Sequence, residues 1–146
     1  MGAMSLLATS YSIPGTLRQD VVVDGRFHLA TDEPERLGGG DSAPSPHELV
    51  PAALAACVST TLLMNARGKG WNLGLVEVDA DYDHRSEPRR CEIVIRTENE
   101  LSDAQLERLA KVAETCPVRR ALASGVEFSE RFEPGSVSRP PLRVAG

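Results

Sequence analysis

The chain of 146 residues is 41% hydrophobic, which is enough for one soluble domain with its own core. A formal net charge of −5, with no basic run longer than two arginines, excludes the electrostatic surface that binds nucleic acids. The longest mainly apolar stretch, Leu49–Val58, is too short to cross a bilayer, and Met1–Leu7 does not look like a signal peptide. We therefore expect a cytoplasmic protein.

A β-hairpin is predicted near the start of the chain. Val21–Val23 and Arg26–Leu29 flank Asp24–Gly25, a pair suited to the left-handed backbone angles of a two-residue turn. The loop that follows, Asp32–Pro44, contains the glycine run Gly38–Gly40. It lacks the lysine and hydroxyl of a phosphate-binding loop, so we interpret it as a flexible connection.

A helix is predicted next, and its start has a clear signature. Ser45 and Glu48 have the spacing of a capping box, with Pro46 at the first helical position. The helix should run to about Ala66, where two nearby glycines end it. Pro51 lies inside this segment and should kink the first turns or delay the regular helix.

Two strands and a second helix are predicted after it. Apolar and acidic residues alternate over Val76–Asp83, and Cys91–Arg96 alternates likewise, with Ser86–Pro88 as the turn between them. Ser102 and Gln105 cap a second helix. Its apolar stripe is predicted to consist of Leu106, Leu109, Ala110, Ala113 and Cys116.

The last predicted elements are a short helix and a strand. Pro117 should open a helix that ends near Gly125, and apolar residues at 126, 128 and 132 predict a final strand. From Pro134 the tail is either disordered or an arm against a partner chain. Strands and helices are segregated, which indicates an α+β fold in a single domain over residues 1–146, ordered from about 8 to 133.

The three cysteines offer two interpretations. An odd number argues against a purely structural disulfide framework, and a thiol pair on two helices suits dithiol redox chemistry. Cys57 shares its helical face with apolar residues and with hydroxyls one turn onward, so a small core residue is the alternative. Cys116 points into the core, but the helix that begins at Pro117 would favour its thiolate. Cys91 lies on the inward strand face and is expected to be buried, structural and remote.

The segment Gly38–Cys57 resembles the OsmC/Ohr family of thiol peroxidases, through Ser45–Leu49 and the small-residue run Ala52–Cys57. The match continues through Arg67–Trp71 and Glu114–Val118, and covers about residues 18 to 132. The resemblance implies an intertwined homodimer with two central helices flanked by strongly curved antiparallel sheets. It also implies active sites at the subunit interface.

The resemblance further implies a function. Cys57 would be the peroxidatic thiol, reducing an organic hydroperoxide to its alcohol and becoming a sulfenic acid. Cys116 would be the resolving thiol and would form the Cys57–Cys116 disulfide, which an external dithiol, typically a lipoyl group in the family, would reduce. Neither a metal nor a bound cofactor is implied.

The chain departs from the family at one catalytic position. Peroxidase members pair an arginine with a glutamate one residue before Glu48, where this chain has His47. Arg36 roughly matches the arginine, and Arg18 is the other candidate. On a straight helix Glu48 faces away from Cys57, so it is best interpreted as the capping partner, unless a kink re-aims it. His47 is either a substitute proton-transfer or cationic group or an exposed histidine at the helix start.

Three functions follow from these residues. The first is a dithiol peroxidase, and the second is a ligand-binding or stress-related dimer of the same fold with little peroxidase activity. A cysteine hydrolase using Cys57 and His47 is disfavoured, because ten helical residues separate the two groups by about 15 Å along the axis.

Overall fold

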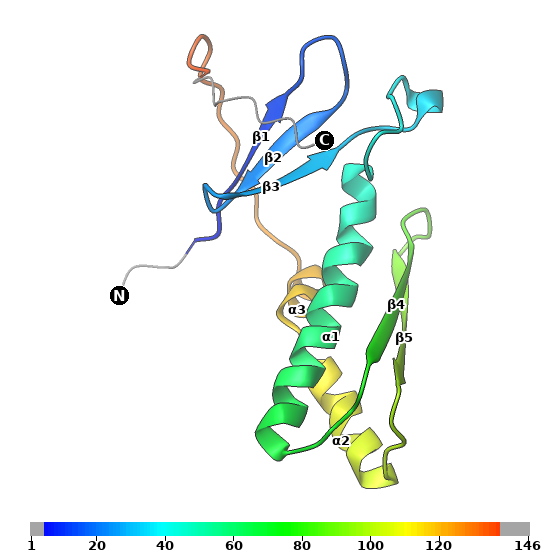
Figure 1. Ribbon diagram of the computed structural model, residues 1–146. Helices are drawn as coiled ribbons and strands as arrows, with labels where there is room; N and C mark the ends of the chain where they lie inside the picture. Colours follow the sequence, from blue (N-terminus) through cyan, green and yellow to red (C-terminus); the bar gives the residue numbers. More distant parts are fainter. Residues whose placement is uncertain (1–4, 138–146) are drawn as a thin grey trace. The chain divides into compact units, whose positions relative to one another are not determined.

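The computed structural model describes residues 5–137 and confirms the α+β class (Figure 1). The chain forms two compact units. One contains residues 1–49 and 130–146, of which 5–49 and 130–137 are described, and the other is Val50–Ser129.

The first unit is built on a three-stranded antiparallel sheet in the order β1 (Ala8–Ser12), β2 (Gln19–Val23), β3 (Phe27–Thr31). The predicted hairpin is confirmed: Asp24 and Gly25 have φ values of 54° and 66°, and the Arg26 N–H donates to the Val23 carbonyl at 3.2 Å. Strand β1 was missed because its residues, mostly small or hydroxylated, carry no apolar alternation.

The loop after β3 is ordered around a carboxylate, so its interpretation as a flexible connection is wrong. Asp32 is 3% exposed and accepts four hydrogen bonds, from the N–H groups of Glu33 (2.8 Å), Gly40 (3.2 Å) and Ser42 (3.1 Å) and from the Ser42 hydroxyl (2.6 Å). The short 3₁₀ helix η1 (Glu35–Leu37) lies within this loop. At Gly39 a Cβ atom would overlap the Glu33 backbone, so only glycine fits there.

The long helix begins and ends through local signals. Ser45 and Glu48 form both hydrogen bonds of the capping box, around the 3₁₀ turn η2 (Pro46–Glu48). The regular helix α1 (Leu49–Lys69) starts after this turn, as the proline at position 51 predicts. It continues past Ala66 because the chain leaves it at Gly70, with φ of 69°.

The end of α1 is a Schellman motif, which explains this difference. The N–H groups of Gly70 and Trp71 donate to the carbonyls of Arg67 (3.2 Å) and Ala66 (2.9 Å). Gly68 lies inside the last helical turn and does not stop it.

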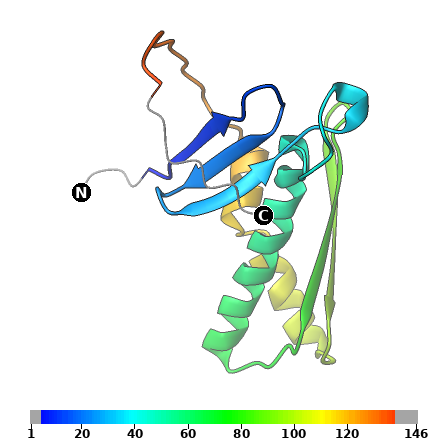
Figure 2. The same cartoon turned by 45° about the horizontal axis from the view of Figure 1, so that its top comes forward.

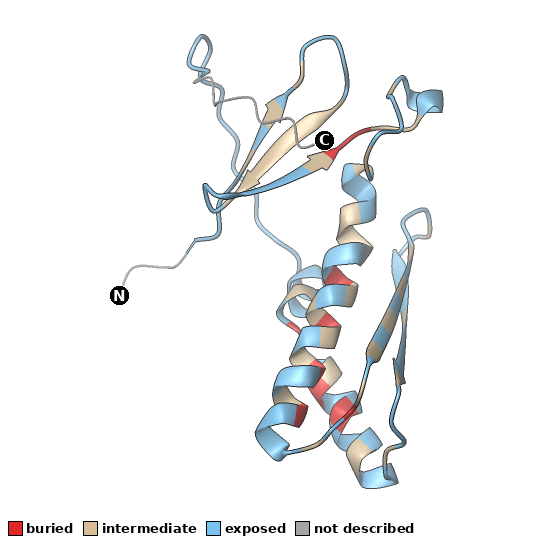
Figure 3. Ribbon diagram, in the orientation of Figure 1, coloured by how far each residue is buried: buried red, intermediate tan, exposed pale blue. Residues whose placement is uncertain are grey.

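The second unit has a core formed by one stripe of α1 and its neighbours. The buried residues of α1 recur every fourth position, as the colouring along one side of the helix shows (Figure 3). Helix α2 (Asp103–Ala113) packs against this stripe, and α3 (Pro117–Ser124) follows it. The buried set is Leu54, Val58, Leu62, Ala66, Leu73, Leu109, Val112 and Cys116.

A two-stranded antiparallel sheet, β4 (Val76–Asp83) and β5 (Arg90–Thr97), lies along the same helix (Figures 1 and 2). The predicted alternation of β4 is confirmed, because the apolar face of the strand is half-buried and its acidic face is exposed. Val78, Ala80 and Ile93 pack against the core.

Four details of the predicted pattern are wrong. On β5, Cys91 and Ile95 are exposed, and on α2 Leu106 and Ala110 are exposed while Val112 is buried. Helix α2 ends before Cys116. No strand forms over residues 126–132 in the described part of the chain, because these residues pair with no other strand there; the side chains at 126, 128 and 132 are exposed.

The segment Pro46–Lys69 is long and apolar enough to cross a membrane by length and composition, with mean hydropathy of 1.6 over its best window. The sequence estimate of a shorter stretch is therefore wrong. Length and composition alone are weak support for a membrane span, since the core helix of a soluble protein passes the same test. Helix α1 supplies half of the buried core residues of its unit.

Candidate active site

Two cysteines meet where α1 passes the junction of α2 and α3. Cys57 lies on α1 beside the buried stripe and is half-buried. Cys116 is fully buried and is the N-cap of α3, with Pro117 at the first helical position. Both thiols are free, and each affects the pKa of the other. The structure therefore brings the two predicted redox thiols together.

The surroundings of Cys57 favour its thiolate. Burial is the largest single influence and opposes ionisation, but three neighbouring donors lower the pKa of Cys57 below its ordinary value. These donors are the Cys116 thiol, the Val118 backbone N–H and the Thr61 hydroxyl. Of the two thiols, Cys57 is accordingly the one whose pKa is lowered.

The surroundings of Cys116 keep its proton in place. Burial and the hydrogen bond to Cys57 raise the pKa of Cys116, although the N–H groups of Arg119 and Val118 act in the opposite sense. The amino end of α3 therefore acts on Cys116 in the expected direction, but burial and Cys57 outweigh it, so the pKa of Cys116 is raised overall. The Val118 N–H, at the second position of α3, also faces the sulfur of Cys57 on another helix.

Thr61 was noted in the sequence only as a hydroxyl one turn after Cys57. Its Oγ1 donates to the Cys57 backbone carbonyl at 2.8 Å. The spacing of four residues on a helix places the two side chains side by side. The Val118 N–H, in contrast, had no sequence signal, because its position depends on how α3 packs against α1.

Cys91 is not part of this site. It is exposed on β5, opposite Tyr82, so the prediction of a buried thiol is wrong. The sheet has only two strands in the described chain, which leaves this position uncovered. Partial desolvation and the Asp81 carboxylate raise the pKa of Cys91, which makes it a poor nucleophile.

The other predicted site residues belong to the first unit. Arg18 donates through Nη1 to the Ser42 hydroxyl (2.6 Å) and carbonyl (3.2 Å), and Ser42 in turn donates to Asp32. Arg36 is exposed in the last turn of η1, and His47 is exposed in η2. The Glu48 carboxylate accepts from the Ser45 N–H at 2.8 Å, as the capping interpretation predicts.

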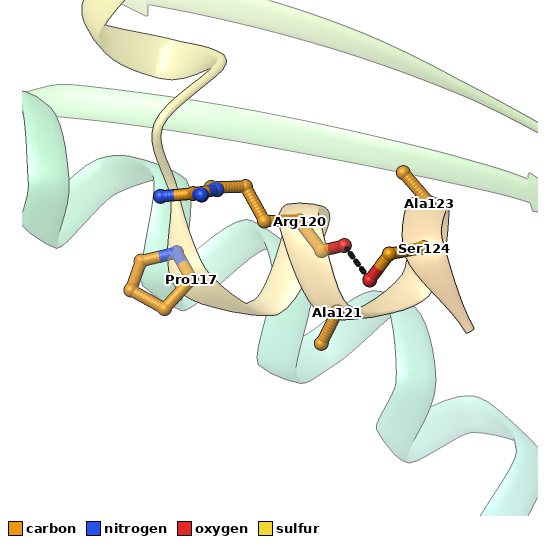
Figure 4. Close-up of a pocket in the computed structure, with 5 residues that line it drawn as sticks. All are labelled: Pro117, Arg120, Ala121, Ala123 and Ser124. Atoms are coloured by element: carbon orange, nitrogen blue, oxygen red, sulfur yellow. Dashed lines mark hydrogen bonds between the residues drawn. The ribbon is translucent and has the colours of Figure 1, made fainter. Parts of the chain in front are cut away.

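A surface pocket lies along α3, and Pro117, the residue after Cys116, lines one end of it (Figure 4). The Arg120 side chain extends toward the Pro117 end of the helix, and the Ser124 hydroxyl donates to the Arg120 carbonyl at 2.9 Å. Two alanines, at 121 and 123, complete the lining. Among the described residues, no group of three or more His, Cys, Asp or Glu side chains could hold a metal ion.

Comparison with known families agrees with this architecture. Residues 38–131, more than half of the chain, match the family model of the OsmC-like protein. The chain therefore belongs to the OsmC-like protein family, as its motifs suggest.

Solved structures of related proteins have the same fold. A provisionally named osmotic stress induced and detoxification response protein from Psychrobacter arcticus 273-4 is 26% identical, with a TM-score of 0.67 over 83% of this chain and 89% of that chain. The organic hydroperoxide resistance protein OsmC of Legionella pneumophila is 22% identical, with a TM-score of 0.59 over 84% and 91%.

A third structure, from Vibrio cholerae, is a provisionally named organic hydroperoxide resistance protein with captopril bound in one of its active sites. It is 23% identical, with a TM-score of 0.60 over 84% of this chain and 86% of that chain. The Legionella and Vibrio structures are similar to this chain in fold alone at such identities. A comparison with curated protein sequences gave no match.

Proposed function

We propose that this protein is a thiol-dependent peroxidase that reduces organic hydroperoxides to alcohols. The observation that supports the proposal most is the thiol pair itself. A half-buried Cys57 whose pKa is lowered lies beside a buried Cys116 whose pKa is raised. A nucleophilic thiolate beside a protonated resolving thiol is the arrangement that two-cysteine peroxide chemistry needs.

The proposed cycle has three balanced steps. The Cys57 thiolate attacks the peroxide, so that an S–O bond forms, the O–O bond breaks, and the alkoxide leaves as the alcohol after taking a proton. Cys116 then attacks the sulfenic acid, forming the Cys57–Cys116 disulfide and releasing water. An external dithiol, of which a lipoyl group is one example, reduces this disulfide by two exchanges and is itself oxidised.

A cationic group near the peroxide oxygens would strengthen the first step, because guanidinium donors stabilise developing negative charge. Arg36 and Arg18 are the candidates, and His47 is a candidate for proton transfer. Comparing Arg18→Ala with Arg36→Ala in the peroxide assay identifies the arginine that acts on the peroxide, because loss of that arginine slows turnover.

We also propose that the protein is a cytoplasmic homodimer. Large apolar side chains remain exposed on the single chain, including Leu63 and Met64 on α1 and two phenylalanines, at 128 and 132, after α3. Exposed apolar surface of this extent is typical of a face that a partner covers. A second copy of the chain, intertwined with the first, is the partner that the family resemblance favours.

The assay follows consumption of cumene hydroperoxide or tert-butyl hydroperoxide against hydrogen peroxide, with dithiothreitol or dihydrolipoamide as reductant. Cys57→Ser should abolish turnover, and Cys116→Ser should stop catalysis at the sulfenic acid, which dimedone would trap. Cys91→Ser is the matched control and should turn over like the wild type, because its thiol lies outside the pair. Equal rates in the wild type and Cys57→Ser would refute the proposal.

One observation favours a second candidate function, a ligand-binding or stress-related dimer with little turnover. The Glu48 carboxylate is occupied in the capping box, and His47 stands where peroxidases of the family carry glutamate. An arginine would then lack its carboxylate anchor. Turnover that stays at the Cys57→Ser level with every hydroperoxide and both reductants would favour this function.

A further inference from the structure

The hydroxyl of Thr61 has two acceptors within reach, and both belong to Cys57. In this structure Oγ1 donates to the Cys57 backbone carbonyl at 2.8 Å. The second acceptor is the Cys57 sulfur, one helical turn away on the same face of α1. A threonine hydroxyl carries a single proton on a rotatable bond, so it can serve only one of them at a time.

This arrangement differs from the other threonine bond of the same kind nearby. Thr115, two residues after the end of α2, also donates to a nearby carbonyl, that of Val112, at 2.7 Å. Such local bonds are ordinary for threonine in helices. The Val112 side chain has no hydrogen-bond acceptor, so the Thr115 hydroxyl can bind only the carbonyl of that residue. The Thr61 hydroxyl has a second acceptor on its partner residue, the Cys57 sulfur, once Cys57 ionises.

We propose that Thr61 is a further catalytic residue, whose hydroxyl donates to the Cys57 carbonyl while Cys57 is a thiol and turns to the sulfur when the thiolate forms. Thr61 thereby increases the fraction of Cys57 that is ready to attack. The catalytic role of Thr61 rests on the proposed function. The exchange of acceptors does not, because it depends only on the ionisation of Cys57.

The neighbouring groups fit this role. Within residues 50–129, the titratable side chain that faces Cys57 is Cys116, from the junction of α2 and α3. The arginines of α3, Arg119 and Arg120, are exposed. The Val118 N–H is fixed by the backbone, so Thr61 is the donor that can reorient on ionisation alongside the Cys116 thiol. A bond to an ionised acceptor is stronger than one to a neutral carbonyl, which favours the exchange.

The test measures the ionisation of Cys57 directly, apart from peroxide turnover. In a Cys91→Ser background, the rate of alkylation by iodoacetamide is followed against pH, with peptide mapping to confirm Cys57 as the alkylated residue. Thr61→Val removes the hydroxyl at nearly constant shape, Thr61→Ala removes it with a good helix former, and Thr61→Ser keeps it. Thr60→Val is the matched control, because its exposed side chain lies on the same helix.

Thr61→Val and Thr61→Ala should raise the pKa of alkylation by about half to one unit, which reduces the rate about three- to ten-fold at a pH below that pKa. The loss is smaller than for a complete charged hydrogen bond, because the carbonyl bond is given up in exchange. Thr61→Ser and Thr60→Val should leave the curve unchanged. Unchanged curves for both Thr61→Val and Thr61→Ala, or an equal shift in Thr60→Val, would overturn the inference.

The result is separable from the fate of the peroxidase proposal. A protein without peroxide turnover that still shows the shift would keep Thr61 as the donor to the thiolate, with the peroxidase proposal refuted. Peroxide turnover with no shift would refute the role of Thr61 alone.

Discussion

Asp32 illustrates how one side chain can order a long connection. Its carboxylate accepts four hydrogen bonds from the loop that follows β3, and through Ser42 it is connected to Arg18. The hydrogen bond from the Ser42 hydroxyl lowers the pKa of Asp32 most, and those from three backbone N–H groups lower it further, while burial raises it. Together they lower the pKa of Asp32 from 3.8 to about 2.

Replacing this carboxylate should destabilise the protein. In Asp32→Asn one oxygen becomes an NH₂ group that faces N–H donors, so at least one hydrogen bond is lost and a repulsive contact replaces it. We expect a lower midpoint of urea unfolding at neutral pH. Asp41→Asn, at an exposed position of the same loop, is the control and should leave the midpoint nearly unchanged.

The same residue predicts a pH dependence. Because the pKa of Asp32 is lower in the folded protein, its stabilising effect is complete above the unfolded value of 3.8 and is lost as the pH falls toward about 2. The difference in unfolding midpoint between the wild type and Asp32→Asn should therefore shrink over this range. A difference that stays constant down to pH 2 would contradict the assignment.

At the residue scale, sequence reasoning succeeded where the partners are close in the chain. The capping role of Glu48 follows from its spacing to Ser45, and the structure has it. The ionisation of the two cysteines could not be predicted in this way. The amino end of α3 assists Cys57, from another helix, and no local pattern records which sulfur a packed helix end will face.

At the scale of elements, helix α2 provides a direct test of periodicity against packing. The sequence pattern assigns both Leu106 and Leu109 to the core stripe, but Leu106 is 51% exposed and Leu109 is 7% exposed. The helix ends at Ala113 rather than continuing to Cys116, and Val112 takes a core position in place of Leu106.

Alanine substitution should separate the two leucines. Leu109→Ala leaves a cavity in the core and should lower the free energy of unfolding by about 2–5 kcal/mol. Leu106→Ala, its matched control, should cost less than about 1 kcal/mol, since most of that side chain is already in contact with solvent. Urea unfolding of both variants measures the two costs, and equal costs would favour the periodicity over the structure.

The elements with local start and stop signals were predicted best. Both capping boxes, the hairpin turn at Asp24–Gly25 and the start of α3 at Pro117 are as expected. The end of α1 was misplaced because two glycines compete, and only Gly70 has the left-handed angle that the motif requires. The prediction of a final strand was wrong because a strand needs a neighbouring strand to pair with, and the sequence of a segment does not show whether one is present.

At the scale of the whole molecule, the proposed homodimer is open to direct measurement. Sedimentation velocity at micromolar concentration should show a species of about twice the chain mass of 15.7 kDa. The exposed apolar side chains of α1 supply the physical reason, because water would otherwise cover them. A single species at the mass of one chain, across the micromolar range, would contradict the prediction.

The two thiols also join distant points of the chain, and this has a topological consequence. A bond between Cys57 and Cys116 would close the chain between them into a covalent ring. This ring would consist of the second half of α1, both strands of the β4–β5 sheet and all of α2. A ring of about 60 residues removes enough conformational freedom from the unfolded chain to stabilise the folded one by about 4 kcal/mol. The oxidised protein should therefore melt several degrees higher than the reduced one, while Cys116→Ser should melt alike under both conditions. Differential scanning calorimetry with and without reductant would then use heat resistance as a gauge of the redox state.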